Sequence, residues 1–395
     1  MRWRREATII VSLVAVGVVL FAVAWVLTRT FERRRDALAR RWFNAGQQAL
    51  SASQPQTAIA DLRSALFYKN DDLYRLRLAE ALAQANYTDQ AKAYLLNLWE
   101  ERPGSSNINL ELARVAAQQH NTADAMRYYH GAIFGVWDSD AIEHRMETRL
   151  ELIRFLLQQN QTSSAYGEIT SLAAGIPPDN PQMHAVAGDL FTRTGDSASS
   201  LTQYEMALKN DPYSFAALAG AARAAFASGK FRRAKQHLNA AIREHPDDSA
   251  MTKLLEQTDL VLASDPLERH LPREQRVQRT LTAFNQAGVR LDQCGEPVSL
   301  SPSLTAKKIS NSADSNSVTA NTNRAAQDLA PLATEWNNLR PSMNARSLSL
   351  NSDLLENAVD LVSRIEQAAD KSCGPPAGLD WALLQLANYG SEVER

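Results

Sequence analysis

The sequence lacks the motifs that mark common catalytic and nucleotide-binding sites. It contains no G-x-G-x-x-G, no Walker loop, no G-x-S-x-G and no H-E-x-x-H. Its seven histidines include no pair four residues apart, so a helical zinc site is not indicated. We therefore expect a protein that is not an enzyme and that needs no cofactor and no metal.

Neither sign of charge is in large excess. The chain has 42 Lys and Arg against 44 Asp and Glu, a net charge of −2. A basic excess is the electrostatic mark of nucleic-acid binding, so no nucleic-acid partner is expected. Only 16 Gly and 15 Pro occur in 395 residues, which favours a helical protein. The length is sufficient for two or more domains.

Cysteine is nearly absent. Cys294 and Cys373 are the two cysteines, and they lie too far apart in sequence for a common metal or redox motif. Each ends a predicted helix directly before a glycine. A structural disulfide and an oxidising compartment are favoured, and two buried free thiols are the alternative.

Charge is absent from residues 7–28. The 20 residues from Thr8 to Leu27 would span roughly 30 Å as a helix, the thickness of the hydrocarbon core. We predict an uncleaved anchor that contacts the lipid bilayer. A cleaved signal peptide is the alternative, because Ala22-Val23-Ala24 fits a cleavage site, although apolar residues and then arginines follow it.

The arginines leave two orientations open. More of them follow the anchor than precede it, which favours a cytoplasmic location for the remaining chain. The short basic tail at 1–6 and the two cysteines favour the opposite side. We predict a single-pass protein of a bacterial inner membrane with its soluble domains in the periplasm, with the cytoplasm as the alternative.

Two near copies of one segment meet at residues 211–246. Pro212 is matched 34 residues later by Pro246, and small residues precede both prolines at equal distances. The matched pairs are Gly188 and Ala222, Gly195 and Gly229, Ser200 and Ala234, and Ala207 and Ala241. Small residues allow two helices to pack closely, and glycine suits a left-handed turn between them. The period indicates stacked helical hairpins.

These small residues, turn glycines and terminal prolines resemble the tetratricopeptide repeat family. The resemblance implies an α-solenoid of about six helical hairpins. Earlier hairpins share the phase, since Ala58, Ala91 and Ala125 are spaced by 33 and 34 residues. The fourth hairpin adds about six residues between Phe134 and His144 and lacks the expected small residue near Ile153.

The predicted fold is therefore all-α, with an N-terminal transmembrane helix, a solenoid and a small C-terminal helical bundle. In chain order we expect a short basic tail (1–6), the anchor (7–28), a basic juxtamembrane helix (29–39), the solenoid (40–247), a capping helix (248–264) and the bundle (265–395). A mobile Ser/Asn-rich loop is predicted near 297–323.

In the resembled family the first helices of the hairpins line a groove that binds extended peptides or partner helices. The matching positions here are Phe43, Gln47, Leu76, Glu80, Leu110, Arg114, Asp189, Arg223 and Phe226. We predict a membrane-tethered scaffold that binds a protein or peptide partner in this groove. The alternatives are an enzyme or small-ligand-binding protein with its site in the C-terminal bundle, and a purely structural module that associates with itself.

Overall fold

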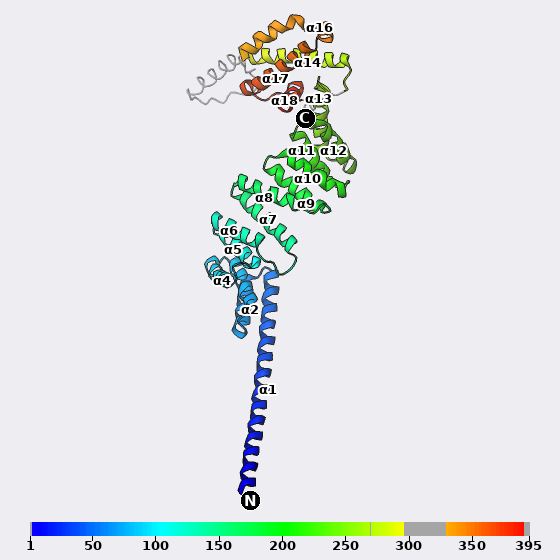
Figure 1. Cartoon of the computed structure of the whole chain (residues 1–395). Coiled ribbons are helices and arrows are strands. Elements are labelled where there is room, and N and C mark those ends of the chain that lie inside the picture. The colour runs from blue at the N-terminus through cyan, green and yellow to red at the C-terminus, as the bar shows by residue number, and fades with distance from the viewer. Residues whose placement is uncertain (1, 269, 296–328, 391–395) are drawn as a thin grey trace, which may run out of the picture. The chain divides into compact units, whose positions relative to one another are not determined.

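The computed structural model describes residues 2–268, 270–295 and 329–390, without the side chains of 2–16 and 295 (Figure 1). Apart from one isolated bridge between Ser105 and Val136, every regular element among these residues is helical. This confirms the predicted all-helical fold. The chain divides into two compact units, residues 1–175 and 176–395, so the predicted solenoid has parts in both.

Unit 1 consists of four antiparallel helical hairpins. Its helices are α1 (Arg2–Ser51), α2 (Pro55–Tyr68), α3 (Asp72–Gln84), α4 (Thr88–Glu101), α5 (Ser106–Gln118), α6 (Thr122–Phe134), α7 (Ala141–Gln158) and α8 (Thr162–Ala174).

Unit 2 contains two more hairpins, a following helix and the C-terminal bundle. Its helices are α9 (Pro181–Arg193), α10 (Ser197–Asn210), α11 (Phe215–Ala227), α12 (Phe231–Glu244), α13 (Ser249–Ser264), α14 (Arg273–Gly295), a helix over 329–339, the 3-10 helix η1 (Arg340–Ser342), α16 (Ala345–Leu350), α17 (Ser352–Cys373) and α18 (Gly378–Tyr389).

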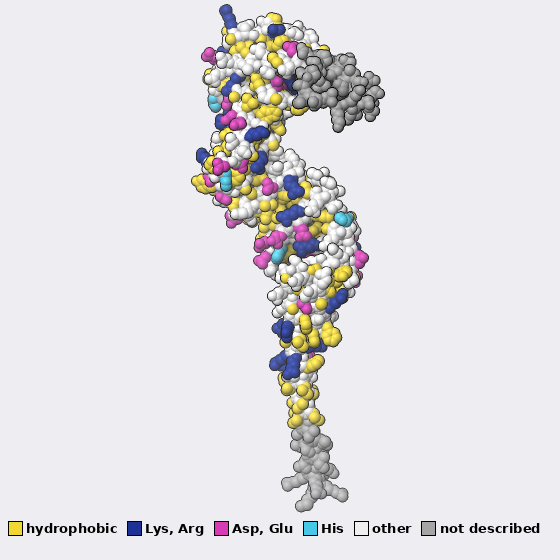
Figure 2. Space-filling view, turned by 180° about the vertical axis from the view of Figure 1, so that it is seen from behind, with side chains coloured by type: hydrophobic (Ala, Val, Ile, Leu, Met, Phe, Trp, Pro, Cys, Tyr) yellow, Lys and Arg dark blue, Asp and Glu magenta, His cyan; other side chains and the backbone are white. Residues whose placement is uncertain are grey.

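The first helix is continuous where the sequence suggested several segments. α1 joins the predicted tail, anchor, juxtamembrane helix and first repeat helix without a break. Figure 2 shows apolar and arginine side chains on its described part. Residues 7–16 of the predicted anchor lie among those without described side chains. Within the described part of the chain, no helix is long and apolar enough to cross a bilayer.

Small residues lie where the two helices of a hairpin make contact, as predicted. A Cβ added to Gly46 in α1 would lie 2.6 Å from Cγ of Leu62 in α2. One added to Gly188 in α9 would lie 2.9 Å from the ring of Tyr204 in α10. Both distances are shorter than a van der Waals contact, so these positions require glycine for the observed helix separation.

A left-handed residue joins the helices of every hairpin. Gly195 and Gly229 have φ of +84° and +73°, which confirms their predicted role. The other hairpins place Ser53, Asn86, His120 and Asn160 at this point, all with positive φ. The turn geometry therefore recurs even where glycine is missing.

The C-terminal bundle packs against the last hairpin. Its core includes Phe284 and Ile365, and the indole of Trp336 stacks on Phe284 with ring centroids 5.2 Å apart. A disulfide joins Cys294 at the end of α14 to Cys373 at the end of α17, with a Cα–Cα distance of 5.6 Å. The predicted loop near 297–323 lies outside the described residues.

Candidate functional site

Three consecutive first helices of unit 1 end in glutamine. Gln84, Gln118 and Gln158 are the last residues of α3, α5 and α7. Their side chains are exposed, and none has a hydrogen-bond partner within the described parts of the chain. One helical turn earlier, on the same side of each helix, stand Glu80, Arg114 and Arg154. We call these six residues, together with Gln47 of α1, the first-helix face of unit 1.

Arg114 anchors a polar network beneath this face. Its Nε and Nη2 donate to the two carboxylate oxygens of Glu151 in α7, at 2.9 and 2.8 Å. Its Nη1 donates to Oε1 of Glu111 at 2.7 Å, and the hydroxyl of Tyr129 in α6 donates to Oε1 of Glu151 at 2.9 Å. Paired hydrogen bonds of this kind fix both position and direction, so the network joins α5, α6 and α7.

Burial sets the protonation of this network. Glu111 is buried, and burial raises the pKa of its carboxyl against the opposing effect of Arg114. Burial, followed by the charge of Glu151, also raises the pKa of Tyr129, so its hydroxyl remains a donor. Burial opposes the charge on Arg114, but its bonds to Glu151 and Glu111 raise the pKa of its guanidinium. The network therefore holds α5, α6 and α7 together, and it contains no activated nucleophile.

The predicted groove residues of unit 1 differ in exposure. Phe43 is buried and stacks on Tyr74, with ring centroids 4.4 Å apart, so it belongs to the core. Leu76 and Leu110 are half-buried and pack on the same core. The polar members Gln47, Glu80 and Arg114 reach the surface, and Arg77 donates to Oε2 of Glu80 at 2.7 Å.

The remaining predicted groove residues belong to unit 2, so the nine candidates are divided between the units. Asp189 accepts a hydrogen bond from the hydroxyl of Tyr204. Arg223 is exposed, and no ion pair to it occurs among the described residues. Phe226 stacks on Trp381 of α18, with ring centroids 6.2 Å apart, and is therefore covered by the C-terminal bundle.

The sequence-based candidates did not include the row of Gln84, Gln118 and Gln158, although the regular spacing of these glutamines is visible in the sequence. Gln84 and Gln118 are 34 residues apart, and Gln118 and Gln158 are 40 apart. The extra six residues match the insertion already visible between Phe134 and His144. Glu111 and Glu151 gave no comparable signal, because only the folded chain shows that both carboxylates contact Arg114.

Among the residues that the structure describes, no three His, Cys, Asp or Glu side chains gather in a way that could hold a metal ion.

Comparison with known proteins identifies the repeat. Residues 193–258 match the sequence model of the tetratricopeptide repeat, a region from the end of α9 into α13. The chain therefore contains tetratricopeptide repeats within a helical, solenoid-like fold. No curated protein matches the sequence.

Several solved repeat structures are similar at low identity. One is YrrB, described as a TPR protein with an unusual peptide-binding site: 15% identity, 49% of this chain and 97% of YrrB covered, TM-score 0.37. Another is the C-terminal part of a TPR protein from Cytophaga hutchinsonii, with 14% identity, coverage of 60% and 92%, and a TM-score of 0.42. A third is the TPR2AB domain of yeast Sti1 in complex with pHSP90, with 15% identity, coverage of 56% and 99%, and a TM-score of 0.24.

Proposed function

We propose that this protein is a non-enzymatic scaffold, tethered to a bacterial inner membrane, that holds a protein partner on the first-helix face of unit 1. The row of Gln84, Gln118 and Gln158 supports this proposal most strongly. A side-chain amide both donates and accepts hydrogen bonds, as the backbone of an extended peptide does. A repeated row of such amides can therefore bind a peptide segment along its length.

The network beneath the row favours binding by a preformed surface. Arg114 and Glu151 are held by two hydrogen bonds, so the helices that carry Gln118 and Gln158 are fixed before a partner arrives. Less conformational entropy is then lost on binding. The half-buried Leu76 and Leu110 add apolar contact beside the amides.

The membrane tether is proposed from α1. Large apolar side chains that are more than half exposed follow one another on this helix, including Leu20, Phe21 and Leu27. The guanidinium of Arg29 lies over the ring of Trp25, 4.4 Å from its centroid. Aromatic and basic residues at the end of an apolar run are typical of the membrane interface. Deleting residues 7–28 should release the protein from carbonate-washed membranes, and continued sedimentation would contradict the tether.

The Cys294–Cys373 disulfide supports the proposal that the soluble domains lie in the periplasm, because such bonds persist in oxidising compartments. A membrane-impermeant maleimide applied to intact cells should label the protein only after reduction. A cytoplasmic domain would stay unlabelled in both conditions and would react only after lysis.

The partner-binding face can be tested by photo-crosslinking in living cells. A photoreactive amino acid at Gln118 should capture one dominant partner. The matched control places it at Gln90, an exposed glutamine of the second helix α4. Equal capture from both positions, or capture from Gln90 alone, would contradict the proposed face.

A further inference from the structure

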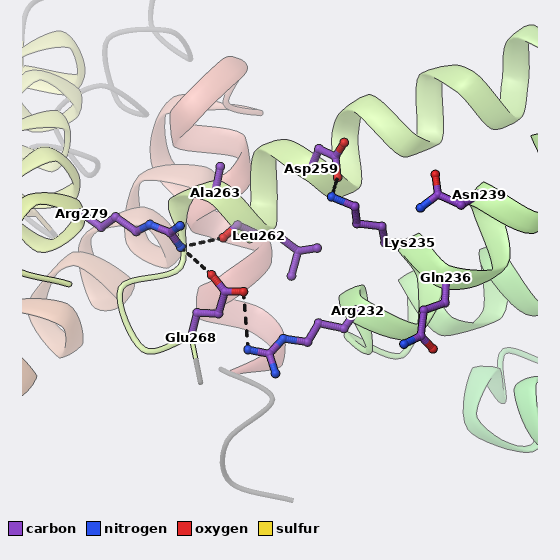
Figure 3. A pocket seen from close by; sticks show the side chains of 9 residues that line it. All are labelled: Arg232, Lys235, Gln236, Asn239, Asp259, Leu262, Ala263, Glu268 and Arg279. Atoms are coloured by element: carbon purple, nitrogen blue, oxygen red, sulfur yellow. Dashed lines mark hydrogen bonds and ion pairs between the residues drawn. The ribbon is translucent and has the colours of Figure 1, made fainter. Parts of the chain in front are cut away.

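A cleft lined mostly by polar and charged residues lies in unit 2, away from the first helices. It has a volume of about 630 Å³ and lies between α12, α13 and the start of α14 (Figure 3). Arg232, Lys235, Gln236 and Asn239 line it from α12, and Asp259 faces them from α13. Its size is within the range of ligand-binding pockets, and it is open to solvent along one side.

The cleft has one positive charge in excess, since Arg232, Lys235 and Arg279 are set against Asp259 and Glu268. Lys235 pairs with Asp259 at 2.8 Å, and both side chains are nearly half exposed. Arg279 donates to the carbonyl oxygens of Leu262 and Asp265 and to Oε2 of Glu268, each at 2.9 Å. Arg279 is thus fixed by the end of α13, whereas Lys235 can exchange its partner.

Two amides extend the polar wall. Gln236 and Asn239 project from the same helix as Lys235, and Figure 3 shows all three beside the cleft. Both amides are exposed and lack a hydrogen-bond partner among the residues that the structure describes. Leu262 supplies an apolar surface opposite them. A net positive charge, two amides without a described hydrogen-bond partner and an apolar wall are thus combined in one open cleft.

We propose that this cleft binds an extended peptide segment through a carboxylate. Lys235 would contact the carboxylate, Gln236 and Asn239 would bond to the peptide backbone, and Leu262 would contact an apolar side chain. The open shape suits a chain that passes through better than an enclosed small molecule. The carboxylate can belong to a Glu or Asp side chain or to a peptide C-terminus. The site is independent of the first-helix face of unit 1.

Fluorescence anisotropy of the full chain in detergent micelles can test this. The probes are three fluorescein-labelled alanine octapeptides: one with a central Glu and an amidated end, one with Gln in its place, and one with a free C-terminal carboxylate. At least one carboxylate peptide should bind ten-fold more tightly than the Gln peptide, and which one does so identifies the source of the carboxylate. Equal affinity of all three, or no binding up to 1 mM, would overturn the proposal.

Variants then assign the binding to this cleft. Lys235→Met should weaken the carboxylate peptide about ten-fold and remove its salt dependence. Lys253→Met, at an exposed lysine of α13 outside the cleft, is the matched control and should leave affinity unchanged. Asn239→Ala removes an amide without changing charge and should weaken binding several-fold. Unchanged binding by both cleft variants would overturn the assignment, and thermal melting would show that each variant remains folded.

Discussion

Tyr129 in unit 1 and Tyr204 in unit 2 occupy the same repeat position with different surroundings. Each stands four residues after a small buried residue, and each hydroxyl donates to a carboxylate on a first helix. In unit 1 that carboxylate, Glu151, also binds Arg114 through two hydrogen bonds. In unit 2 the nearby Arg223 remains exposed. The tyrosine at this repeat position thus belongs to a hydrogen-bond network with an arginine in unit 1, whereas in unit 2 it lies near an arginine that remains exposed.

The two units also differ in what fixes neighbouring hairpins. Tyr204 packs between Gly188 and Gly220, and an added Cβ at either glycine would overlap its ring. The hairpin of α7 and α8 has the buried Ile153 where a small residue was expected. There the Arg114 network joins α5 and α7 across the insertion. Close packing therefore fixes unit 2 at this position, and charged hydrogen bonds fix unit 1.

The largest effect on stability is expected from a buried carboxyl group in the bundle that, unlike Glu111 and Glu151, has no described hydrogen-bond partner. Glu366 in the bundle is buried, and neither of its oxygens has a hydrogen-bond partner among the described residues. Burial, followed by the charge of Asp380 and opposed by Arg290, raises the pKa of Glu366 to about 8 from 4.5. The unfolded chain loses this proton above its ordinary pKa, and the folded chain keeps it until about pH 8.

The contribution of Glu366 to stability should therefore be greatest below pH 4.5 and fall as the pH rises to about 8, by up to roughly 5 kcal/mol. Glu366→Gln should remove this slope and stabilise the bundle at pH 8. Hydrogen exchange of α17 measured over this pH range would show it. The same slope in the variant would mean that Glu366 is not responsible.

Gly220→Ala should have the next largest effect. Its new methyl group would press on a tyrosine ring that Gly188 and Asp189 also confine. Overpacking of this kind lowers the free energy of unfolding by about 2–3 kcal/mol. The control is Gly167→Ala in α8, where nothing lies within 4 Å, and it should be neutral or slightly stabilising. Similar losses in both variants, measured by thermal denaturation, would show that Tyr204 is not confined.

The two arginines give a direct contrast between the units. Arg114→Met leaves the buried Glu111 without its cation and should destabilise unit 1 by about 2 kcal/mol. Arg223→Met should change stability by less than about 0.5 kcal/mol, as exposed substitutions do. Hydrogen exchange of α5 and α11 separates the two effects. Equal effects would remove the distinction between the units.

The smallest effect concerns the turns. His120 has a φ of +55°, so His120→Gly should relieve strain and stabilise unit 1 by roughly 0.5 kcal/mol. Asn86→Gly should gain less, because asparagine tolerates this conformation better. Denaturant unfolding measures both, and a loss of stability in His120→Gly would show that its side chain matters more than its backbone.

The helical fold was predictable because its packing is periodic. Residues such as Gly188 and Ala222 recur where two helices meet, and Gly195 and Gly229 recur at left-handed turns, so spacing alone was informative. The site was less predictable. Whether Arg114 is available or already bound depends on Glu151, which lies 37 residues away in sequence and on another hairpin. Phe226 matched a groove position, but the distant α18 covers it.

The most direct test concerns partner binding by the first-helix face of unit 1. The partner captured at Gln118 should be measured by co-purification with two triple variants of equal composition. Replacing Gln84, Gln118 and Gln158 by alanine should reduce the partner's recovery at least ten-fold. Replacing three exposed glutamines of the second helices, Gln56 in α2, Gln90 in α4 and Gln161 at the N-cap of α8, should leave it unchanged. Full recovery with the first variant, or equal loss with both, would contradict binding at this face.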